Sequence, residues 1–297
     1  MPTKPLALFG HVGKSPVTFS FRLSRYRDGT YGRVALNITS GFQVDEQAPR
    51  YYEAHVRHFM QPFVEALIAQ AVRNGDAVLD VACGTGFATR AASEKVGSKG
   101  RVVGTDLNPH MLATARSVAH NGNITWHPAS ALDLPFADEE FDVVICQQGV
   151  QFFPDPGAGL REMARVSKRG IAITAWSALK DSPYLATAWD MLTRRCGTSP
   201  AQYATGFSER DDISGWFRAA NLQPVSINLV EAVVSLPPVA EYLPDHFMTV
   251  PFAGDYFQLG AAARADAVRD VDERLRDFRT ADGLDVPFSA YIASTIS

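Results

Sequence analysis

The feature that most constrains the fold is a short β-branched segment that leads into a glycine-rich turn and then into a helix. Residues 77–82 (Ala-Val-Leu-Asp-Val-Ala) have the character of a buried strand, Cys-Gly-Thr-Gly at 83–86 forms the turn, and residues 87–96 have a helical pattern. Glycine lets the backbone of such a turn approach a ligand without a Cβ in between. The sequence therefore predicts a ligand-binding edge at the end of this strand.

Strands and helices continue to alternate along the chain. The apolar periodicity predicts helices over 51–71, 87–96, 109–119, 159–167, 184–195, 211–221 and 263–278, and strands over 77–82, 101–106, 124–127, 141–146, 171–176, 225–234 and 286–296. This alternation is typical of an α/β fold with a parallel sheet covered by helices on both faces. Residues 236–283 contain four prolines in their first half, and we expect these prolines to interrupt regular secondary structure there. An insertion at this position in an α/β fold commonly forms a lid.

Composition favours small-molecule chemistry. A chain of 297 residues with 46% hydrophobic and 20% charged residues can bury one large core with additions. A net charge of −4 gives no electrostatic reason to expect a nucleic acid partner or an anionic membrane. No apolar run approaches the roughly 20 residues of a membrane span, and three scattered cysteines indicate a reducing compartment. We expect a cytoplasmic protein with no metal site and no membrane span; its oligomeric state is left open.

The first part of the chain has a different charge balance from the rest. Residues 1–36 contain six lysines and arginines but a single acidic residue, Asp28. Such a segment is typical of a targeting sequence, a nucleic-acid-binding arm or a poorly ordered tail. We interpret residues 1–40 as a basic, poorly ordered extension and residues 41–297 as the folded domain.

The acidic residues at the ends of the first two strands indicate the kind of ligand. Asp106 ends the strand after the glycine turn and lies twenty residues past Gly86, where a carboxylate can accept hydrogen bonds from ribose hydroxyls. A dinucleotide fingerprint would have a third glycine where this chain has Thr89, which weakens a pyrophosphate-binding interpretation. An adenosine-containing ligand fits both observations.

Four motifs in register resemble the class I S-adenosylmethionine-dependent methyltransferases. The motifs are Val-Leu-Asp-Val-Ala-Cys-Gly-Thr-Gly (78–86), Val-Gly-Thr-Asp-Leu-Asn (103–108), Ser-Ala-Leu-Asp-Leu-Pro-Phe (130–136) with Phe-Asp-Val-Val (141–144), and Glu-Met-Ala-Arg-Val (162–166) leading into 171–176. Within that family the chain is similar to the small-molecule branch that includes the ubiquinone and menaquinone biosynthesis methyltransferases. The resemblance implies a Rossmann-like, seven-stranded, mostly parallel sheet. Residues 50–176 would form the cofactor-binding core, 177–283 the substrate pocket and lid, and 286–296 the last strand.

The resemblance also implies roles for individual residues, with S-adenosyl-L-methionine as the cofactor. Its methionine end would meet the glycine turn and the loop after the 141–146 strand, its ribose would meet Asp106, and its adenine would lie between two short segments. The implied cofactor contacts are Tyr51, Tyr52, Asp80, Ala82, Gly84, Gly86, Asp106, Leu107, Met111, Ser130, Ala131, Leu132, Gln147 and Gln148. Many relatives have aspartate where this chain has Ser130.

We expect methyl transfer to a small organic acceptor by in-line displacement, in which the protein aligns the reactants and excludes water. Among the seven histidines, His246 in the expected lid is the candidate base. Three alternatives stay open at this point. They are a relative that catalyses cyclisation or another rearrangement, a non-catalytic binding protein for the same cofactor, and a nicotinamide oxidoreductase, which Thr89 disfavours.

Overall fold

The computed structural model describes residues 24–25, 31–32, 48–200, 206–250 and 253–296. The chain divides into two units, Met1–Asn37 and Ile38–Ser297. In the first unit, strands β1 (Ser24–Arg25) and β2 (Tyr31–Gly32) pair in antiparallel fashion. The predicted poor order of residues 1–40 otherwise falls outside the described residues.

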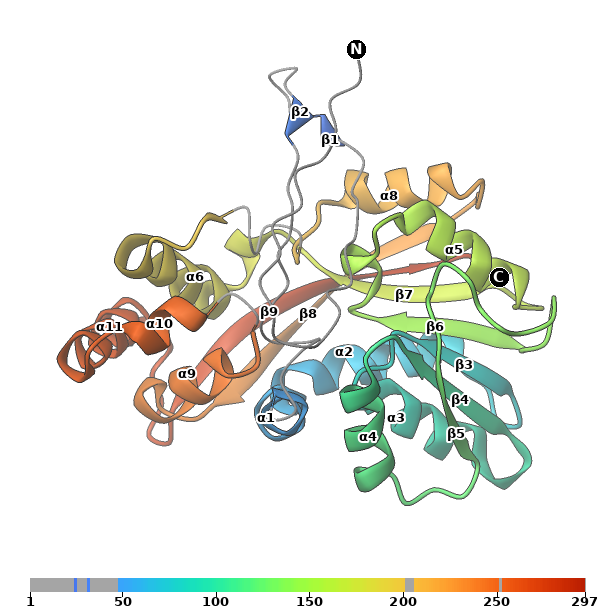
Figure 1. Ribbon diagram of the computed structural model, residues 1–297, viewed down its shortest axis with the longest axis horizontal. Coiled ribbons are helices and arrows are strands. Elements are labelled where there is room, and N and C mark those ends of the chain that lie inside the picture. The colour runs from blue at the N-terminus through green and yellow to red at the C-terminus, as the bar shows by residue number, and fades with distance from the viewer. Residues whose placement is uncertain (1–23, 26–30, 33–47, 201–205, 251–252, 297) are drawn as a thin grey trace, which may run out of the picture. The chain divides into compact units, whose positions relative to one another are not determined.

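A seven-stranded sheet forms the centre of the second unit, as expected (Figure 1). Its strands are β3 (Ala77–Val81), β4 (Arg101–Asp106), β5 (Ile124–Pro128), β6 (Val143–Gln147), β7 (Ile171–Trp176), β8 (Ser226–Leu236) and β9 (Leu284–Ser294). They lie in the order β5-β4-β3-β6-β7-β9-β8. The first five are parallel, whereas β9 is antiparallel to both β7 and β8. The carboxyl ends of the five parallel strands therefore meet at one edge, where ligands bind in open α/β sheets.

Helices cover both faces of the sheet. They are α1 (Ala48–His55), α2 (Arg57–Ala71), α3 (Phe87–Val96), α4 (Pro109–Val118), α5 (Pro156–Arg165), α6 (Pro183–Cys196), α8 (Arg210–Ala219), α9 (Val239–Phe247), α10 (Gly254–Gln258) and α11 (Ala261–Arg274). Side chains alternate between the faces of a strand, so in β3 Val78 packs with α2 and α3 while Leu79 packs with α5 and α8. Among the described residues, no helix is long and apolar enough to cross a bilayer.

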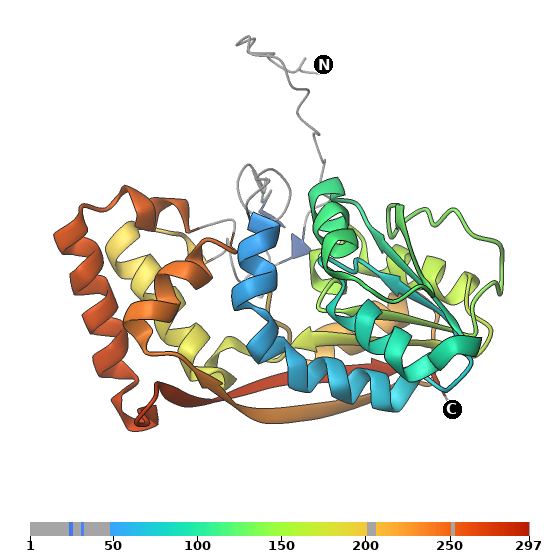
Figure 2. The same ribbon diagram turned by 90° about the horizontal axis from the view of Figure 1, so that it is seen from below.

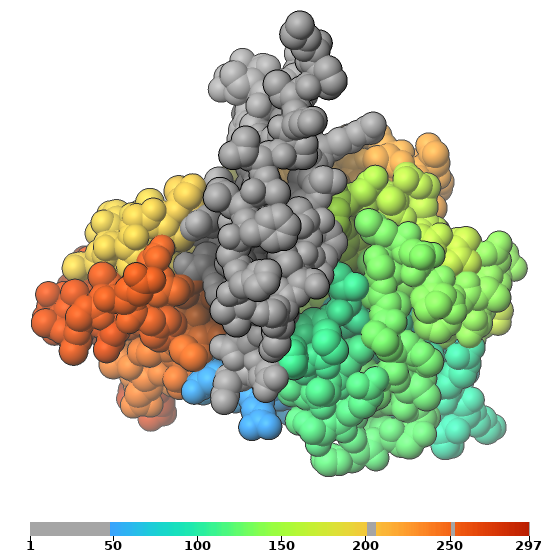
Figure 3. Space-filling view, viewed as in Figure 1, coloured from blue at the N-terminus to red at the C-terminus, as the bar shows by residue number. Residues whose placement is uncertain are grey.

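The last two strands extend well beyond the rest of the sheet. Residues 290–294 of β9 pair with both β7 and β8, whereas residues 284–289 pair with β8 alone. Figure 2 shows this long hairpin carrying α6, α9 and α11 at its far end. In Figure 3, α6, α10 and α11 form the yellow to orange-red surface on one side of the unit, opposite the green surface of α4 and α5. We call α6, α9, α10 and α11 the helical lobe.

The helical lobe is the expected C-terminal insertion, but it does not occupy the whole of residues 177–283. Helix α8 packs against α5 on the sheet, with Ile213 and Phe217 fully buried there. The lobe also contains a helix where prolines were expected to break the chain, because α9 continues through Pro244. Besides His246, four of the nine residues of α9 have buried apolar or aromatic side chains. The free energy of this packing outweighs the loss of the hydrogen bond that proline cannot donate.

Two other helices differ from the sequence expectation. The helix expected over 51–71 is two helices that meet at Val56. At this junction the carbonyl oxygen of His55 accepts a hydrogen bond from the Tyr242 hydroxyl of α9, with a distance of 2.8 Å. Helix α5 begins three residues earlier than expected, because Asp155 caps it by accepting from the backbone N–H of Ala158 and Pro156 occupies its first position.

Candidate cofactor and acceptor site

The turn between β3 and α3 has the backbone conformation that a glycine turn requires. Ala82, Gly84 and Gly86 have φ angles of 55°, 56° and 89°, a region that favours glycine. A Cβ added to Gly84 would meet no atom within 4 Å, so the turn faces open space there. A Cβ on Gly86 would lie 2.5 Å from the ring of Trp126. Gly84 thus leaves room for a ligand. At Gly86 a side chain is excluded by the packing of Trp126, which the sequence did not indicate.

Asp80 lies directly before this turn and is completely buried. The Thr89 hydroxyl donates to its Oδ2 atom at 2.6 Å, whereas its Oδ1 atom is buried with no hydrogen-bond partner among the described residues. Burial raises the pKa of Asp80 to about 7; the nearby charge of Asp106 adds to the rise, and the Thr89 hydrogen bond opposes it. A buried carboxyl oxygen without a partner is suited to bind a cation such as an ammonium group.

Asp106 lies beside the glycine turn at the end of β4. Its Oδ2 atom accepts from the backbone N–H of Gly84 and its Oδ1 atom from that of Asn108, both at 2.8 Å. Burial raises the pKa of Asp106, and these backbone hydrogen bonds limit the rise. Each carboxylate oxygen can accept more than one hydrogen bond. Asp106 is therefore held in place and still able to accept hydrogen bonds from ribose hydroxyls, the role that we expect for it.

Helix α1 packs against the start of α3, and it distinguishes the two tyrosines. Tyr52 stacks on Phe87 with ring centroids 5.6 Å apart, and burial followed by the charge of Asp106 raises the pKa of Tyr52. Tyr51 instead stacks on His55, with centroids 6.0 Å apart. Tyr52 is thus the tyrosine that packs against the first residue of α3, directly after the glycine turn, and the cofactor contacts of both tyrosines stay predictions.

A charged pair joins the same two helices. Arg90 of α3 donates to Glu53 of α1 at 2.6 Å, and it also donates to the carbonyl oxygen of Thr85 in the glycine turn at 2.7 Å. The side chains of Arg90 and Glu53 are only 16% and 17% exposed. No sequence pattern indicates this contact, because a charged residue on an amphipathic helix is normally solvated.

The residues expected around adenine lie at the carboxyl ends of β4 and β5. Leu107 is 55% exposed, which is unusual for a large apolar side chain, whereas Met111 is buried in α4. The Ser130 hydroxyl accepts from the backbone N–H of Leu132 at 3.2 Å, and Ser130, Ala131 and Leu132 are all half-buried. An exposed leucine next to Asp106 would be covered by a bound base.

Gln147 ends β6, which lies on the other side of β3 from β4, and Gln148 follows it directly. The Gln147 amide contacts the sulfur of Met60 in α2 at 3.3 Å. Gln148 is 7% exposed and has a φ angle of 54°, in the left-handed region. Its side-chain oxygen accepts from the amide of Gln151, which the sequence did not single out although it follows Gln148 by one helical turn.

His246, the expected base, lies in the interior of the helical lobe. Its ring packs against Phe59, Tyr184 and Trp189, and its Nδ1 atom is 2.9 Å from the Tyr184 hydroxyl. It is 2% exposed, and burial lowers its pKa to about 3. A group with so low a pKa is a weak proton acceptor at neutral pH. The geometry gives His246 a packing role and does not favour it as the base.

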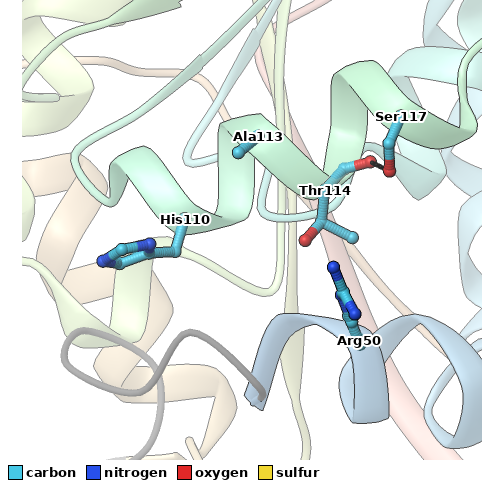
Figure 4. A pocket seen from close by; sticks show the side chains of 5 residues that line it. All are labelled: Arg50, His110, Ala113, Thr114 and Ser117. Carbon is cyan, nitrogen blue, oxygen red and sulfur yellow. Dashed lines mark hydrogen bonds between the residues drawn. The ribbon is translucent and has the colours of Figure 1, made fainter.

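A surface pocket lies between α1 and α4. Figure 4 shows Arg50 of α1 pointing toward Thr114 of α4, with the remaining lining side chains along α4. The lining residues are Arg50, His110, Ala113, Thr114 and Ser117, and the Ser117 hydroxyl donates to the Thr114 carbonyl oxygen at 2.7 Å. None of these five is a predicted cofactor contact, so the pocket does not define the candidate site.

The donor set around the glycine turn fits the expected cofactor. S-adenosylmethionine has an ammonium group, two ribose hydroxyls and an apolar base. Asp80 has a buried oxygen without a partner, Asp106 has remaining acceptor capacity, Gly84 faces open space and Leu107 exposes an apolar surface. In the described part of the chain, no cluster of three histidine, cysteine or acidic side chains could hold a metal ion.

Comparison with known proteins agrees with this geometry. A family profile described as a methyltransferase domain matches residues 78–170. The chain is 31% identical over 172 residues to a demethylmenaquinone methyltransferase of Staphylococcus carnosus, which covers 52% of this chain and 71% of that protein. It is 39% identical over 104 residues to a 2-phytyl-1,4-naphtoquinone methyltransferase of Synechococcus elongatus, covering 34% of this chain and 45% of that protein.

A solved structure shares the fold. The YcgJ protein of Bacillus subtilis is 20% identical in sequence and superposes with a TM-score of 0.51. The superposition covers 80% of this chain and 97% of that protein. The sequence relationship, the strand order and the residues around the glycine turn lead to one assignment: this chain belongs to the class I S-adenosylmethionine-dependent methyltransferases, with distant homology to the menaquinone and ubiquinone C-methyltransferases.

Proposed function

We propose that this protein transfers the methyl group of S-adenosylmethionine to a small organic acceptor by in-line displacement. The observation that carries the proposal is the Asp80 carboxyl oxygen, buried without a partner, beside a glycine turn to which Asp106 is hydrogen-bonded. Two similar relatives are named for demethylmenaquinone and 2-phytyl-1,4-naphtoquinone, which are organic compounds with a quinone ring. These names support an acceptor of that general kind.

The bound cofactor supplies a methyl group on a positively charged sulfur, which is already strongly electrophilic. The chain's own residues would bind and orient it. Asp80 would accept from its ammonium group, Asp106 from the ribose hydroxyls, and Gly84 would let the backbone approach closely. Alignment of acceptor, methyl carbon and sulfur then supplies most of the rate enhancement.

Two side chains that could take a proton from the acceptor are poor bases here. His246 has a pKa of about 3, and burial keeps the Tyr52 hydroxyl protonated because it raises the pKa further. The proposal therefore favours an acceptor whose reacting atom is nucleophilic without a protein base, such as an amine, an activated carbon or an acidic hydroxyl.

Calorimetric titration with S-adenosylmethionine, S-adenosylhomocysteine and NADH tests the binding part of the proposal. We expect binding of the first two in the micromolar range and none of NADH. Asp106→Asn should weaken that binding at least about tenfold. The change replaces a charged hydrogen-bond acceptor by a neutral one, and we expect this to reduce the binding free energy by about 1.4 kcal/mol or more. Asp181→Asn, a change at an exposed aspartate outside the site, serves as the matched control.

The reaction itself needs a separate measurement. Incubation with isotopically labelled S-adenosylmethionine and candidate acceptors should move the label into product. A protein that binds the cofactor and converts a substrate without moving the label would instead support cyclisation or another rearrangement. Binding of NADH in place of the two adenosyl compounds would overturn the proposal entirely.

A further inference from the structure

The turn after β6 holds a glutamine in a conformation that side chains rarely adopt. Gln148 has a φ of 54°, and its backbone N–H is held by Thr174, with 3.0 Å to the hydroxyl and 3.2 Å to the carbonyl oxygen. Such backbone strain persists only where the surroundings impose it, and it is common at functional sites. A Cβ on the next residue, Gly149, would lie 2.8 Å from the Cβ of Ala82, so this turn packs directly against the glycine turn.

Gln148 and Gln151 form a buried amide pair in this turn. Both are 7% exposed, and the Gln151 amide nitrogen donates to the Gln148 side-chain oxygen at 2.8 Å. The other two amide atoms, Nε2 of Gln148 and Oε1 of Gln151, are buried with no hydrogen-bond partner among the described residues. Leaving both a buried donor and a buried acceptor without partners costs free energy that an apolar pair would not.

This arrangement does not depend on how the two amides are oriented. If both amides are turned over, Gln148 donates to Gln151, and the free atoms become the Gln148 oxygen and the Gln151 nitrogen. In either orientation the pair leaves one NH₂ donor and one carbonyl acceptor free. The two free groups are neutral and complementary, and they lie at the carboxyl edge of the sheet next to the glycine turn.

We propose that Gln148 and Gln151 recognise a hydroxyl group on the methyl acceptor. A hydroxyl has a lone pair that can accept from the free NH₂ and a proton that it can donate to the free carbonyl oxygen, so its hydrogen-bonding capacity matches the pair. A ketone or ether oxygen would satisfy only the donor, and a charged group would be buried against neutral amides without a counter-charge. The inference deepens the proposed function and rests on it, because it assigns a polar group to the acceptor of that same site.

The test compares two probes on protein saturated with S-adenosylhomocysteine. The probes are 1-naphthol and 1-methylnaphthalene, which have similar size and shape but differ in the hydroxyl; the ring system follows the naphthoquinone in the name of one relative. Binding is measured by quenching of tryptophan fluorescence. The variants are Gln151→Met, which keeps side-chain length and removes the amide, and Gln70→Met, a matched control at an exposed glutamine of α2.

We expect the wild-type protein and the Gln70→Met control to bind 1-naphthol at least about tenfold more tightly than 1-methylnaphthalene. In Gln151→Met this preference should fall to within about threefold, while the affinity for S-adenosylhomocysteine stays within about twofold. The melting temperature of Gln151→Met should fall modestly, because the Gln148 side-chain oxygen loses its donor. A merely structural role for the pair would lower the melting temperature in the same way but would leave the preference for 1-naphthol unchanged.

Three results would overturn the inference. In the first, wild-type protein does not distinguish the probes. In the second, the preference survives in Gln151→Met. In the third, Gln151→Met weakens S-adenosylhomocysteine binding about tenfold, which would assign the pair to the amino-acid end of the cofactor. Failure of the proposed function is separate, because wild-type protein would then not bind S-adenosylhomocysteine.

Discussion

Arg90 joins the glycine turn to Glu53 of α1, a residue 37 positions earlier in the chain. One nitrogen of the guanidinium donates to the Glu53 carboxylate at 2.6 Å and the other to the Thr85 carbonyl oxygen at 2.7 Å. Both side chains are largely shielded from water, and burial lowers the pKa of Arg90 while the Glu53 charge opposes that shift. The pair therefore couples the position of α1, with Tyr52, to the turn that faces the ligand.

Loss of this pair should weaken both stability and cofactor binding. We expect Arg90→Met to lower the free energy of unfolding by about 1–3 kcal/mol, because it leaves Glu53 charged and mostly buried. Affinity for S-adenosylhomocysteine should fall by about three- to thirtyfold, since the Thr85 carbonyl oxygen loses its donor. Urea unfolding and calorimetry measure the two effects.

The control for this prediction is an exposed ion pair. Arg276 and Glu273 are 3.1 Å apart, but their side chains are 61% and 62% exposed. Arg276→Met should change stability by less than about 0.5 kcal/mol and leave cofactor affinity unchanged. Equal effects of the two substitutions would contradict a special role for Arg90. The double variant Glu53→Gln with Arg90→Met should lose less than the two single changes together.

Asp80 should make stability depend on pH in an uncommon direction. Its pKa is about 7 in the folded protein, whereas the ordinary value for an aspartate, which applies to the unfolded chain, is 3.8. Between these two values the folded state binds more protons than the unfolded state, so stability without cofactor should decrease as pH rises from about 4 to about 7 and level off above. Asp80→Asn should remove this contribution. Urea unfolding at several pH values, compared between wild type and variant, isolates it.

The same carboxyl should control cofactor affinity. An ammonium group prefers the ionised form of Asp80, so S-adenosylhomocysteine should bind more tightly as pH rises, by up to roughly tenfold per unit below pH 7, with a plateau above. Thr89→Val removes the hydrogen bond that lowers the Asp80 pKa and should move the plateau to higher pH. An affinity that is independent of pH between 5 and about 8 would show that Asp80 does not bind the ammonium group.

The two glycines of the turn should respond differently to substitution. Gly86→Ala adds a Cβ at 2.5 Å from the Trp126 ring to a residue with a φ of 89°, and we expect a loss of about 2–4 kcal/mol in unfolding free energy. Gly84→Ala meets no atom and should cost only about 1–2 kcal/mol for its φ of 56°, but it should weaken cofactor binding. Gly122→Ala, where a Cβ has open space, is the control.

Relief of the Trp126 contact provides a second check. Trp126→Leu in the Gly86→Ala background should recover part of the lost stability, because the smaller side chain makes room for the new methyl group. If Trp126→Leu lowers the unfolding free energy by the same amount in the Gly86→Ala background as in wild type, the clash with the ring does not explain the effect of Gly86→Ala.

His246 should behave as a packing residue. Tyr184→Phe removes the hydroxyl 2.9 Å from its Nδ1 atom and should lower stability by about 1–2 kcal/mol, because a buried polar atom loses its partner. His246→Leu should lower stability by a similar amount or more and leave S-adenosylhomocysteine affinity within about twofold. A loss of methyl transfer of more than about a hundredfold in a folded His246→Leu variant would restore His246 as the base.

Residues close together in the sequence or on adjacent parallel strands could be predicted. Asp80, Gly84 and Gly86 lie within one strand and turn, and Asp106 ends the strand paired with β3, so local pattern and strand pairing suffice to bring them together. The parallel sheet also followed from the alternation of strands and helices, because parallel strands need helical crossovers, whereas the order of the strands came from the structure.

The sequence by itself determined the sheet, the glycine turn and the two acidic residues beside it, since each depends on short-range periodicity and backbone conformation. Only the tertiary structure decided that Tyr52 and not Tyr51 stacks on Phe87, and that Arg90 reaches Glu53. It also decided that Gln151 pairs with Gln148 and that His246 is buried against Tyr184, 62 residues away. These outcomes depend on how distant helices pack and on how burial changes hydrogen bonding and pKa. Neither the spacing nor the type of these residues encodes that packing locally.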